Sequence, residues 1–575
     1  MPLPNAEIAR VLREIADLLE IQNANPFRVR AYRNAARVVE EHPESVAAIA
    51  ARDPESLTEL PAIGKDLAAT IAEIARKRVP AQLRELKRDA PAGAFEMLGV
   101  PNVGPKRARI IAEKLKIRTR AGLLKAARAG KLRDVPGLGA AIEAKILRDL
   151  EAHRGEEDRI LRATAAQYGE PLLERLRAVK GVARADLAGS FRRARETVGD
   201  LDLLVSCEPG AKVVDAFTSA PEAAETIESG ATKAAIRLHS GLRVDLRVFE
   251  RDAYGAGLHY FTGSKAHNIA IRKLGQERGL KINEYGVWKG AKRLGGREEQ
   301  DVFKAVGLPW IPPEMREDRG EIDAARRHAL PDLVALADMR GDLQSHTTSS
   351  DGRDSLEEMA RAAEELGYEY LAVTDHTPAV RVTGGMDEKG FKRQAAAIDK
   401  LNGKLKKLTV LKGAEVDIHK DGTLDLNDKA LAALDIVLVS IHSYFDLPPA
   451  EQTARVLKAL SHPSVDVFAH PTARLIGRRR PAEFDMEQVI TACLDHGVML
   501  EIDAQPERLD LDDISARTAV ERGVMLTIST DAHATAELGF MRWGVDQAKR
   551  AWAPKKRIAN TRGLKQLLGL LHAKR

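Results

Sequence analysis

The chain has 575 residues, which at about 150 residues per domain predicts about four domains. Hydrophobic residues make up 44% and charged residues 30%, the balance of a soluble globular protein, and no apolar run approaches the roughly 18 residues of a membrane helix. The N-terminal segment lacks the apolar core of a secretory signal. With only Cys207 and Cys493 present, a disulfide framework and a cysteine-based zinc site are excluded, and a reducing cytoplasm is expected.

Charge is distributed unevenly along the chain, although the net charge is only +6. Residues 1–155 contain 28 Lys and Arg against 20 Asp and Glu, and residues 81–133 contain 14 against 4. A basic region joined to a nearly neutral remainder points to a polyanion such as nucleic acid. The alternative is a solvated basic helical surface, and charge alone does not separate the two.

Apolar spacing predicts that residues 1–155 are all helical. One pattern occurs three times, at 57–74, 98–115 and 132–150: an apolar residue, a Pro-x-x-Gly hairpin and an amphipathic helix. The hairpins run from Pro61, Pro101 and Pro136, and the free N–H groups of each following helix suit a phosphate oxygen. The pattern resembles helix-hairpin-helix DNA-binding elements, which contact the backbone without reading sequence. The expected DNA contacts are Gly64, Gly104, Lys106, Arg107 and Gly139.

Short β-branched runs between Asp186 and Phe249 predict a mixed sheet. Asp200 and Asp202 lie two apart on one predicted strand, so both side chains point to one face, and Asp245 offers a third carboxylate on a neighbouring strand. An Asp-x-Asp strand alone is more often plain surface. Three carboxylates on one face repel unless cations lie between them, and two Mg²⁺ ions would bridge them to a nucleotide triphosphate.

These residues lie within motifs, GSFRR, GDLDLL, VDLRV and YFTGSKAHNIAIR, that resemble the family X DNA polymerases over residues 1–310. The resemblance implies that Asp200, Asp202 and Asp245 are the catalytic metal ligands, with Asp245 nearest the primer 3′-hydroxyl. It implies that Gly189, Ser190 and Arg193 hold the triphosphate. The implied nucleotide pocket comprises Tyr260, Phe261, Gly263, Ser264, Lys265, Asn268 and Arg272. Within it, Asn268 would face the minor-groove edge of the incoming base, and Arg272 would face the template.

Two positions depart from the family pattern. Lys265 replaces an acidic residue, and we expect it to attract the triphosphate. In relatives with 5′-deoxyribose phosphate lyase activity, a Schiff-base lysine follows the first hairpin. Thr70 holds the aligned position here and cannot form an imine, while Lys65 is offset by about one helical turn, so no lyase activity is expected through this domain.

From Gly341 onwards, seven apolar strands alternate with helical stretches, which predicts a (βα) barrel. Nine of the fifteen histidines lie in this part, and five of them end apolar strands. A single histidine at a strand end is usually structural. Five on one rim, with carboxylates and without cysteine, indicate a multinuclear hydrolytic metal site for Mn²⁺ or Zn²⁺.

The layout resembles the PHP (polymerase and histidinol phosphatase) domain over 341–575. The resemblance implies two or three ions, held by His346, Asp351, His376, Glu415, His442, His470, Asp531 and His533. Gln344 replaces the first histidine of the family's His-x-His, so one ion should bind less tightly. We expect an active site that depends on added Mn²⁺. Arg474 and 478–480 follow the His470 strand and are either DNA phosphate contacts or an exposed basic loop.

The predicted fold is therefore a multidomain α/β protein with helical helix-hairpin-helix domains, a polymerase-beta-like nucleotidyltransferase palm and a distorted (βα)7 PHP barrel. The expected divisions are 1–80 and 81–155 (helix-hairpin-helix), 156–250 (palm), 251–312 (nucleotide pocket), 313–340 (linker) and 341–575 (PHP). The expected function is gap filling on gapped or primed double-stranded DNA with dNTPs and Mg²⁺, joined to a 3′→5′ exonuclease. Abasic or 3′-blocked ends are further possible substrates. We expect a cytoplasmic, nucleoid-associated monomer without membrane contact.

Two alternatives remain at this level. The barrel could be a metal-stabilised scaffold without catalysis, which Gln344 favours. The whole chain could be a DNA-end binding protein with vestigial chemistry, against which the three carboxylates argue.

Overall fold

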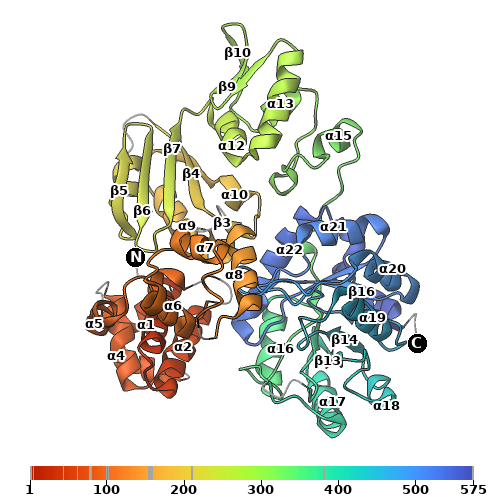
Figure 1. Ribbon diagram of the computed structural model, residues 1–575. Coiled ribbons are helices and arrows are strands. Elements are labelled where there is room, and N and C mark those ends of the chain that lie inside the picture. The colour runs from red at the N-terminus through yellow and green to blue at the C-terminus, as the bar shows by residue number, and fades with distance from the viewer. Residues whose placement is uncertain are drawn as a thin grey trace.

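The computed structural model describes the chain except for residues 1, 2, 4, 43, 44, 61, 77–79, 99, 101, 102, 136, 153–158, 209–211, 380–382 and 573–575. It contains a helical N-terminal region, a mixed sheet, a small α/β unit and a parallel barrel. Figure 1 shows the helical region beneath the mixed sheet, the small unit above it and the barrel beside them. Among the described residues, no helix is long and apolar enough to cross a membrane.

The N-terminal region is entirely helical, as predicted, and one apolar core runs through it from Leu3 to Leu150. Glycine begins the helix after each of the first two hairpins, Gly64 before α4 and Gly104 before α6, and Gly139 directly precedes α8. The hairpin prolines 61, 101 and 136 lie outside the described residues. The helices are α1 (Asn5–Ile21), α2 (Pro26–Glu41), α3 (Val46–Arg52), α4 (Lys65–Ala75), α5 (Ala81–Asp89), α6 (Pro105–Leu115), α7 (Arg120–Arg128) and α8 (Ala140–Ala152).

The mixed sheet, called the palm below, has five strands in the order β2-β4-β7-β6-β5. Strands β4 and β7 are parallel, and the other pairs are antiparallel. Helix α9 (Arg162–Arg177) packs on β2, and the short helix α10 (Gly189–Arg192) leads from β2 towards β4. The elements are β1 (Ile160–Leu161), β2 (Val182–Leu187), β3 (Thr197–Val198), β4 (Asp200–Cys207), α11 (Val213–Thr218), β5 (Ala223–Ser229), β6 (Lys233–Leu238) and β7 (Arg243–Phe249).

The small unit, called the thumb below, packs helices on a three-stranded antiparallel sheet. Its apolar core continues past residue 312 to Met315, Ile322 and Ala325, so the first half of the segment expected as a linker packs against the thumb. The elements are α12 (Tyr254–Thr262), α13 (Lys265–Glu277), β8 (Lys281–Asn283), β9 (Gly286–Lys289), β10 (Lys292–Gly295), α14 (Gln300–Ala305) and α15 (Glu321–Arg326).

The C-terminal domain has seven parallel strands in sequential order, from β11 to β17, which confirms the predicted strand–helix repeat. A parallel bridge between Ser345 and Ala532 joins the first and last strands into a nearly closed barrel. The strands are β11 (Gly341–Asp342), β12 (Tyr370–Val373), β13 (Thr409–Asp417), β14 (Ile436–Ser440), β15 (Val467–Phe468), β16 (Met499–Asp503) and β17 (Leu526–Ser529). The helices are α16 (Leu356–Glu365), α17 (Glu388–Asn402), α18 (Asp428–Leu431), α19 (Pro449–Leu460), α20 (Met486–His496), α21 (Asp513–Arg522), α22 (Met541–Arg550) and α23 (Leu564–His572).

Candidate active sites of the palm and the barrel

The three predicted carboxylates of the palm lie on its two central parallel strands. Asp200 and Asp202 begin β4, and the register places Asp202 directly beside Asp245 of β7. Burial raises the pKa of Asp202 to about 7, and the negative charges of Asp200 and Asp245 add to the shift. Mutual repulsion of this kind is what a bound divalent cation relieves.

The Asp245 carboxylate is occupied by a neighbouring side chain. Arg243 donates from Nε to Oδ2 at 2.7 Å and from Nη2 to Oδ1 at 2.8 Å. Asp200, Asp202 and Asp245 accordingly do not form a compact metal-ligand group among the described residues. The sequence analysis did not single out Arg243, although it lies two residues from Asp245 on the same face of the strand.

Gly189 lies against Asp202 at the turn between β2 and α10. Its φ is +60°, and a Cβ at this position would lie 2.3 Å from Asp202 Oδ2. Only glycine tolerates both the left-handed backbone and the close approach of the carboxylate. The Gly189 turn therefore packs directly against the Asp202 carboxylate. Ser190 and Arg193 lie on the helical turn that follows.

The residues predicted to form the nucleotide pocket gather where α12 meets α13. Arg193 Nη1 donates to Thr262 O at 2.6 Å, and a Cβ on Gly263 would lie 3.1 Å from the same nitrogen. Asn268 Nδ2 donates to Tyr260 O at 2.7 Å, while the buried Asn268 Oδ1 has no hydrogen-bond partner among the described residues. An unpaired buried amide oxygen is costly unless a ligand satisfies it.

The other pocket residues take supporting positions. The Tyr260 and Phe261 rings meet edge to face, with centroids 5.2 Å apart. Ser264 accepts from His267 N and caps α13, whose first residue is the exposed Lys265. Arg272 is exposed and lies one helical turn after Asn268, with its Nε 3.3 Å from Asn268 O.

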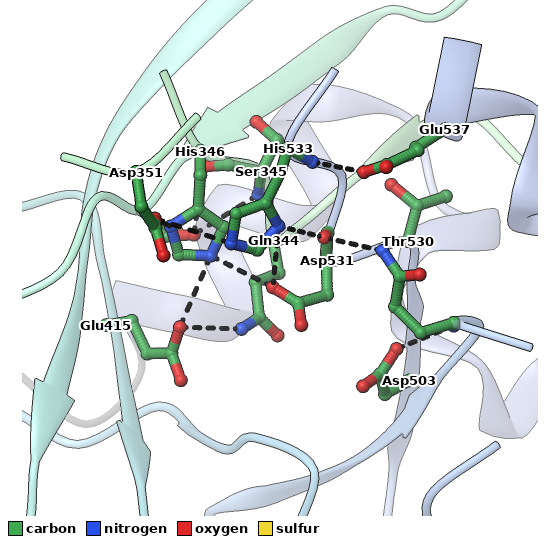
Figure 2. A network of polar contacts seen from close by, with 12 residues as sticks. Gln344, Ser345, His346, Asp351, Glu415, Asp503, Thr530, Asp531, His533 and Glu537 are labelled. Atoms are coloured by element: carbon green, nitrogen blue, oxygen red, sulfur yellow. Dashed lines mark hydrogen bonds and ion pairs between the residues drawn. The ribbon is translucent and has the colours of Figure 1, made fainter. Parts of the chain in front are cut away.

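All eight predicted metal ligands of the barrel converge at one rim, around the buried carboxylate of Glu415. Figure 2 shows five of them: His346, Asp351, Glu415, Asp531 and His533. His470 Nε2 lies 2.7 Å from Glu415 Oε1, and His442 Nε2 lies 3.2 Å from the same oxygen. His346 Nε2 lies 3.3 Å from Glu415 Oε2 and 3.0 Å from Asp531 Oδ1. The ligand atoms form three overlapping groups, which are His346, Asp351, His376 and His533; His376, Glu415 and His442; and His346, Glu415 and Asp531.

The chemistry of these side chains fits bound cations. Burial lowers the pKa of His376 to about 4, which keeps its imidazole neutral and able to bind a metal. Burial alone would also lower the pKa of His442, but the charges of Glu415 and Asp417 raise it to about 9. His346 Nδ1 and His376 Nδ1 make no hydrogen bond among the described atoms, which leaves both nitrogens able to bind a metal.

Backbone strain also gathers at this rim. His470 and Asp531 follow β15 and β17 with φ of +26° and +49°, a region that non-glycine residues rarely occupy. Strain of this kind is held by the surrounding structure and is frequent at functional sites. Buried carboxylates hold these loops: Glu501 accepts from His470 N at 2.7 Å, and Glu537 accepts from His533 N at 2.6 Å.

The sequence analysis missed these supporting carboxylates. Asp375 accepts from the backbone and hydroxyl of Thr347 and from Ser350, and so shapes the loop that carries Asp351. Its place directly before His376 at a strand end was the available signal. Polar partners that orient metal ligands influence affinity nearly as strongly as the ligands do.

Gln344 lies within the same cluster and is fully buried. Its Nε2 donates to Glu415 Oε2 at 3.0 Å, and its Oε1 has no hydrogen-bond partner among the described atoms. Gln344 thus contacts a predicted metal ligand, Glu415, without supplying an imidazole.

Replacing Gln344 with His is expected to tighten metal binding in the barrel by about tenfold, because an imidazole is a stronger ligand than an amide. Titration calorimetry with Mn²⁺ measures the change. The matched control Gln488→His makes the same change at an exposed position of α20, where the side chain of Gln488 contacts Asp485 and no predicted ligand. Equal Mn²⁺ affinity in Q344H and the parent chain would show that Gln344 occupies no ligand position.

Arg474 does not belong to a DNA-facing loop. Its side chain is largely buried, donates to Arg508 O at 2.9 Å and pairs with Glu196 of the palm. Arg478 is exposed and paired with Glu507 at 3.0 Å, and Arg479 donates to Ala473 O at 2.7 Å. Arg474 therefore joins the barrel to the palm.

The fold and the two sites together define a class of protein: a nucleotidyltransferase palm and thumb joined to a metal-binding hydrolase barrel. Family models match residues 3–80 (helix-hairpin-helix domain), 95–152 (SAM-like helix-hairpin-helix tandem), 257–317 (DNA polymerase beta thumb) and 342–574 (PHP domain). The chain belongs to the family X DNA polymerases that carry a C-terminal PHP domain.

Individual relatives support this assignment. The chain is 36% identical to "DNA polymerase/3′-5′ exonuclease PolX" of Bacillus subtilis, over 98% of this chain and 99% of the relative. It is 28% identical to a "Probable phosphatase" of Thermoanaerobacter sp. over 38% of this chain and 89% of the relative. It is 24% identical to "DNA polymerase lambda" of Arabidopsis thaliana over 50% of this chain and 57% of the relative. The predicted membership and architecture are thereby confirmed.

Proposed function

We propose that the chain is a DNA-directed DNA polymerase that fills short gaps in DNA repair, and that it degrades DNA from the 3′ end in its PHP domain. The observation that carries the first activity is the pairing of Asp202 with Asp245 on β4 and β7, beside the Gly189 turn. The relative from Bacillus subtilis, which matches along nearly the whole chain, carries both activities in its name.

In the polymerase reaction, Asp200, Asp202 and Asp245 would hold two Mg²⁺ ions. When bound, these ions neutralise triphosphate charge and make the primer hydroxyl a better nucleophile. The Gly189–Ser190 turn and Arg193 bind the outer phosphates, and Asp245 accepts the proton of the primer 3′-hydroxyl. Tyr260, Phe261 and Gly263 line the sugar side of the pocket, Asn268 faces the minor-groove edge of the incoming base, and Arg272 contacts the template.

In the PHP domain, the eight clustered ligands hold two or three Mn²⁺ or Zn²⁺ ions. When bound, these ions supply a nucleophile near neutral pH and neutralise phosphodiester charge. The buried carboxylates around them keep the imidazoles in place while a DNA 3′ end is cleaved. Abasic and 3′-blocked ends also carry phosphate esters and are further substrates.

DNA binds through the helix-hairpin-helix elements. The α-carbons of Gly64, Gly104 and Gly139 face open space, so a phosphate can approach the backbone N–H groups of the helices that follow. Lys106 and Arg107 add positive charge in the first turn of α6. We place this enzyme in the cytoplasm, with the chromosome, as a monomer.

A one-nucleotide-gap substrate with separate labels on the primer and downstream strands tests both activities in one experiment. Extension should need dNTPs and Mg²⁺, and 3′→5′ shortening should need Mn²⁺ and no dNTP. A chain that extends primers but never shortens them, at any Mn²⁺ concentration, would favour the second candidate, a polymerase with a metal-stabilised PHP scaffold. Gln344 at a ligand position is the observation behind that candidate.

A further inference from the structure

The barrel and the palm meet where side chains of α22 contact side chains of α9. Arg162 of α9 is buried, pairs with Asp546 at 2.8 Å and lies over the Trp543 ring at 4.6 Å. Trp543 also packs with Ala166 in an apolar cluster shared by the two domains. An ion pair and an apolar contact between the same two helices hold α22 firmly on the palm.

Arg550, the last residue of α22, contacts the turn that carries Arg193, the side chain proposed to bind the triphosphate. Arg550 is buried, and its Nη1 donates to the main-chain oxygen of Arg193 at 2.8 Å. The same nitrogen lies 3.0 Å from Glu317 Oε1. Nη2 donates to Asp513 at 2.6 Å, and Arg319 also holds Asp513 at 2.8 Å.

Glu317 joins Arg550 to the side chain of Arg193. Arg193 Nε lies 3.1 Å from the same oxygen, Glu317 Oε1, that receives Arg550. Burial alone would raise the pKa of Glu317, but the charges of Arg193 and Arg550 hold it below its usual value, so the carboxylate is ionised. One carboxylate oxygen is therefore shared between an arginine of the palm and an arginine of the PHP domain.

We propose that Arg550 is a positioning residue for the polymerase reaction, through which the PHP domain controls how readily Arg193 can bind the triphosphate. The inference rests on the role proposed above for Arg193. A carboxylate shared with Arg550 attracts the Arg193 guanidinium less strongly than one that faces Arg193 alone. The hydrogen bond to the Arg193 carbonyl also fixes the backbone from which the guanidinium extends. Incoming triphosphate therefore competes with a weakened ion pair.

Two substitutions should move the dNTP affinity in opposite directions. In Arg550→Gln, Glu317 faces Arg193 alone and holds it, so KM for dNTP should rise by about tenfold, within the 5–150-fold range typical of coupled sites. In Glu317→Gln, the neutral amide releases Arg193, so KM should fall by about fivefold. Because the coupling acts on binding, kcat should change less than KM in both variants.

A matched control lies on the same helix. Arg542 of α22 also pairs across the domain boundary, with Glu170 at 3.1 Å, but none of its described contacts reaches Arg193 or Glu317. Arg542→Gln should leave KM for dNTP unchanged. The 3′→5′ exonuclease rate and the melting temperature of each variant report whether the domains remain folded.

Single-nucleotide insertion kinetics decide the matter. A higher KM for dNTP in R550Q together with a lower KM in E317Q supports the proposal. A KM that changes in the same direction in both variants overturns it, and so does a change in R542Q as large as that in R550Q. If R550Q does not fold, Arg550→Lys replaces it and should give a smaller rise in KM. A parent chain that does not extend primers would overturn the proposed function itself, whereas unchanged KM values in an active chain overturn only this inference.

Discussion

Replacing Asp202 with Asn is expected to reduce primer extension by at least about 10³-fold while the 3′→5′ exonuclease rate stays unchanged. The amide keeps the shape of the side chain, which matters because its oxygen packs against the Gly189 α-carbon. It removes the charge that would hold both cations. Loss of metal-based charge stabilisation is worth several kcal/mol, and each 1.36 kcal/mol is about a tenfold change in rate.

A second carboxylate in the palm provides the control. Asp215 of α11 is exposed and lies apart from the three clustered carboxylates, so Asp215→Asn should extend primers at the parent rate. Extension by D202N at more than about one tenth of the parent rate would place the metal ligands elsewhere. Removal of one carboxylate should also relieve repulsion, so D202N should unfold at the same temperature as the parent chain or at a slightly higher one.

The seven strands of the barrel could be predicted because each is an apolar run followed directly by polar residues. Parallel strands buried on both faces give this strong signal, and their C-terminal ends share one rim. That is why five histidines, Glu415 and Asp531 could be placed together at strand ends, whereas Asp351 rested on the resemblance to the PHP domain. Residue roles at both sites remain predictions, although the geometry brings the residues together.

Weak or distant signals account for what was not predicted. Strand β5 is an edge strand whose side chains are mostly exposed, so AAETIES carries no alternating pattern. Arg550 lies 357 residues from Arg193, and Arg474 lies 278 residues from Glu196. Contacts between residues so far apart in the sequence depend on how the domains dock. No local pattern in a single sequence predicts them. Arg474 therefore looked like part of a basic loop.

Replacing Glu415 with Gln is expected to abolish the exonuclease, by at least about 10³-fold, and to leave primer extension intact. Glu415 is the one carboxylate that faces His346, His376 and His442 and lies 2.7 Å from His470. Glu415 is a member of two of the three groups of potential metal ligands. The loss of metal-derived charge stabilisation sets the size of the effect.

Metal-dependent stability separates a catalytic barrel from a scaffold. Mn²⁺ at about 100 times its Kd should stabilise the folded parent chain by about 2.7 kcal/mol, and the stabilisation should be much smaller in E415Q. Glu451→Gln, an exposed residue of α19, is the control and should behave like the parent in both assays. If E415Q loses the Mn²⁺ stabilisation but still shortens DNA at the parent rate, the nuclease lies outside this cluster. If the parent binds Mn²⁺ but shortens no DNA, the barrel stabilises the polymerase without catalysis.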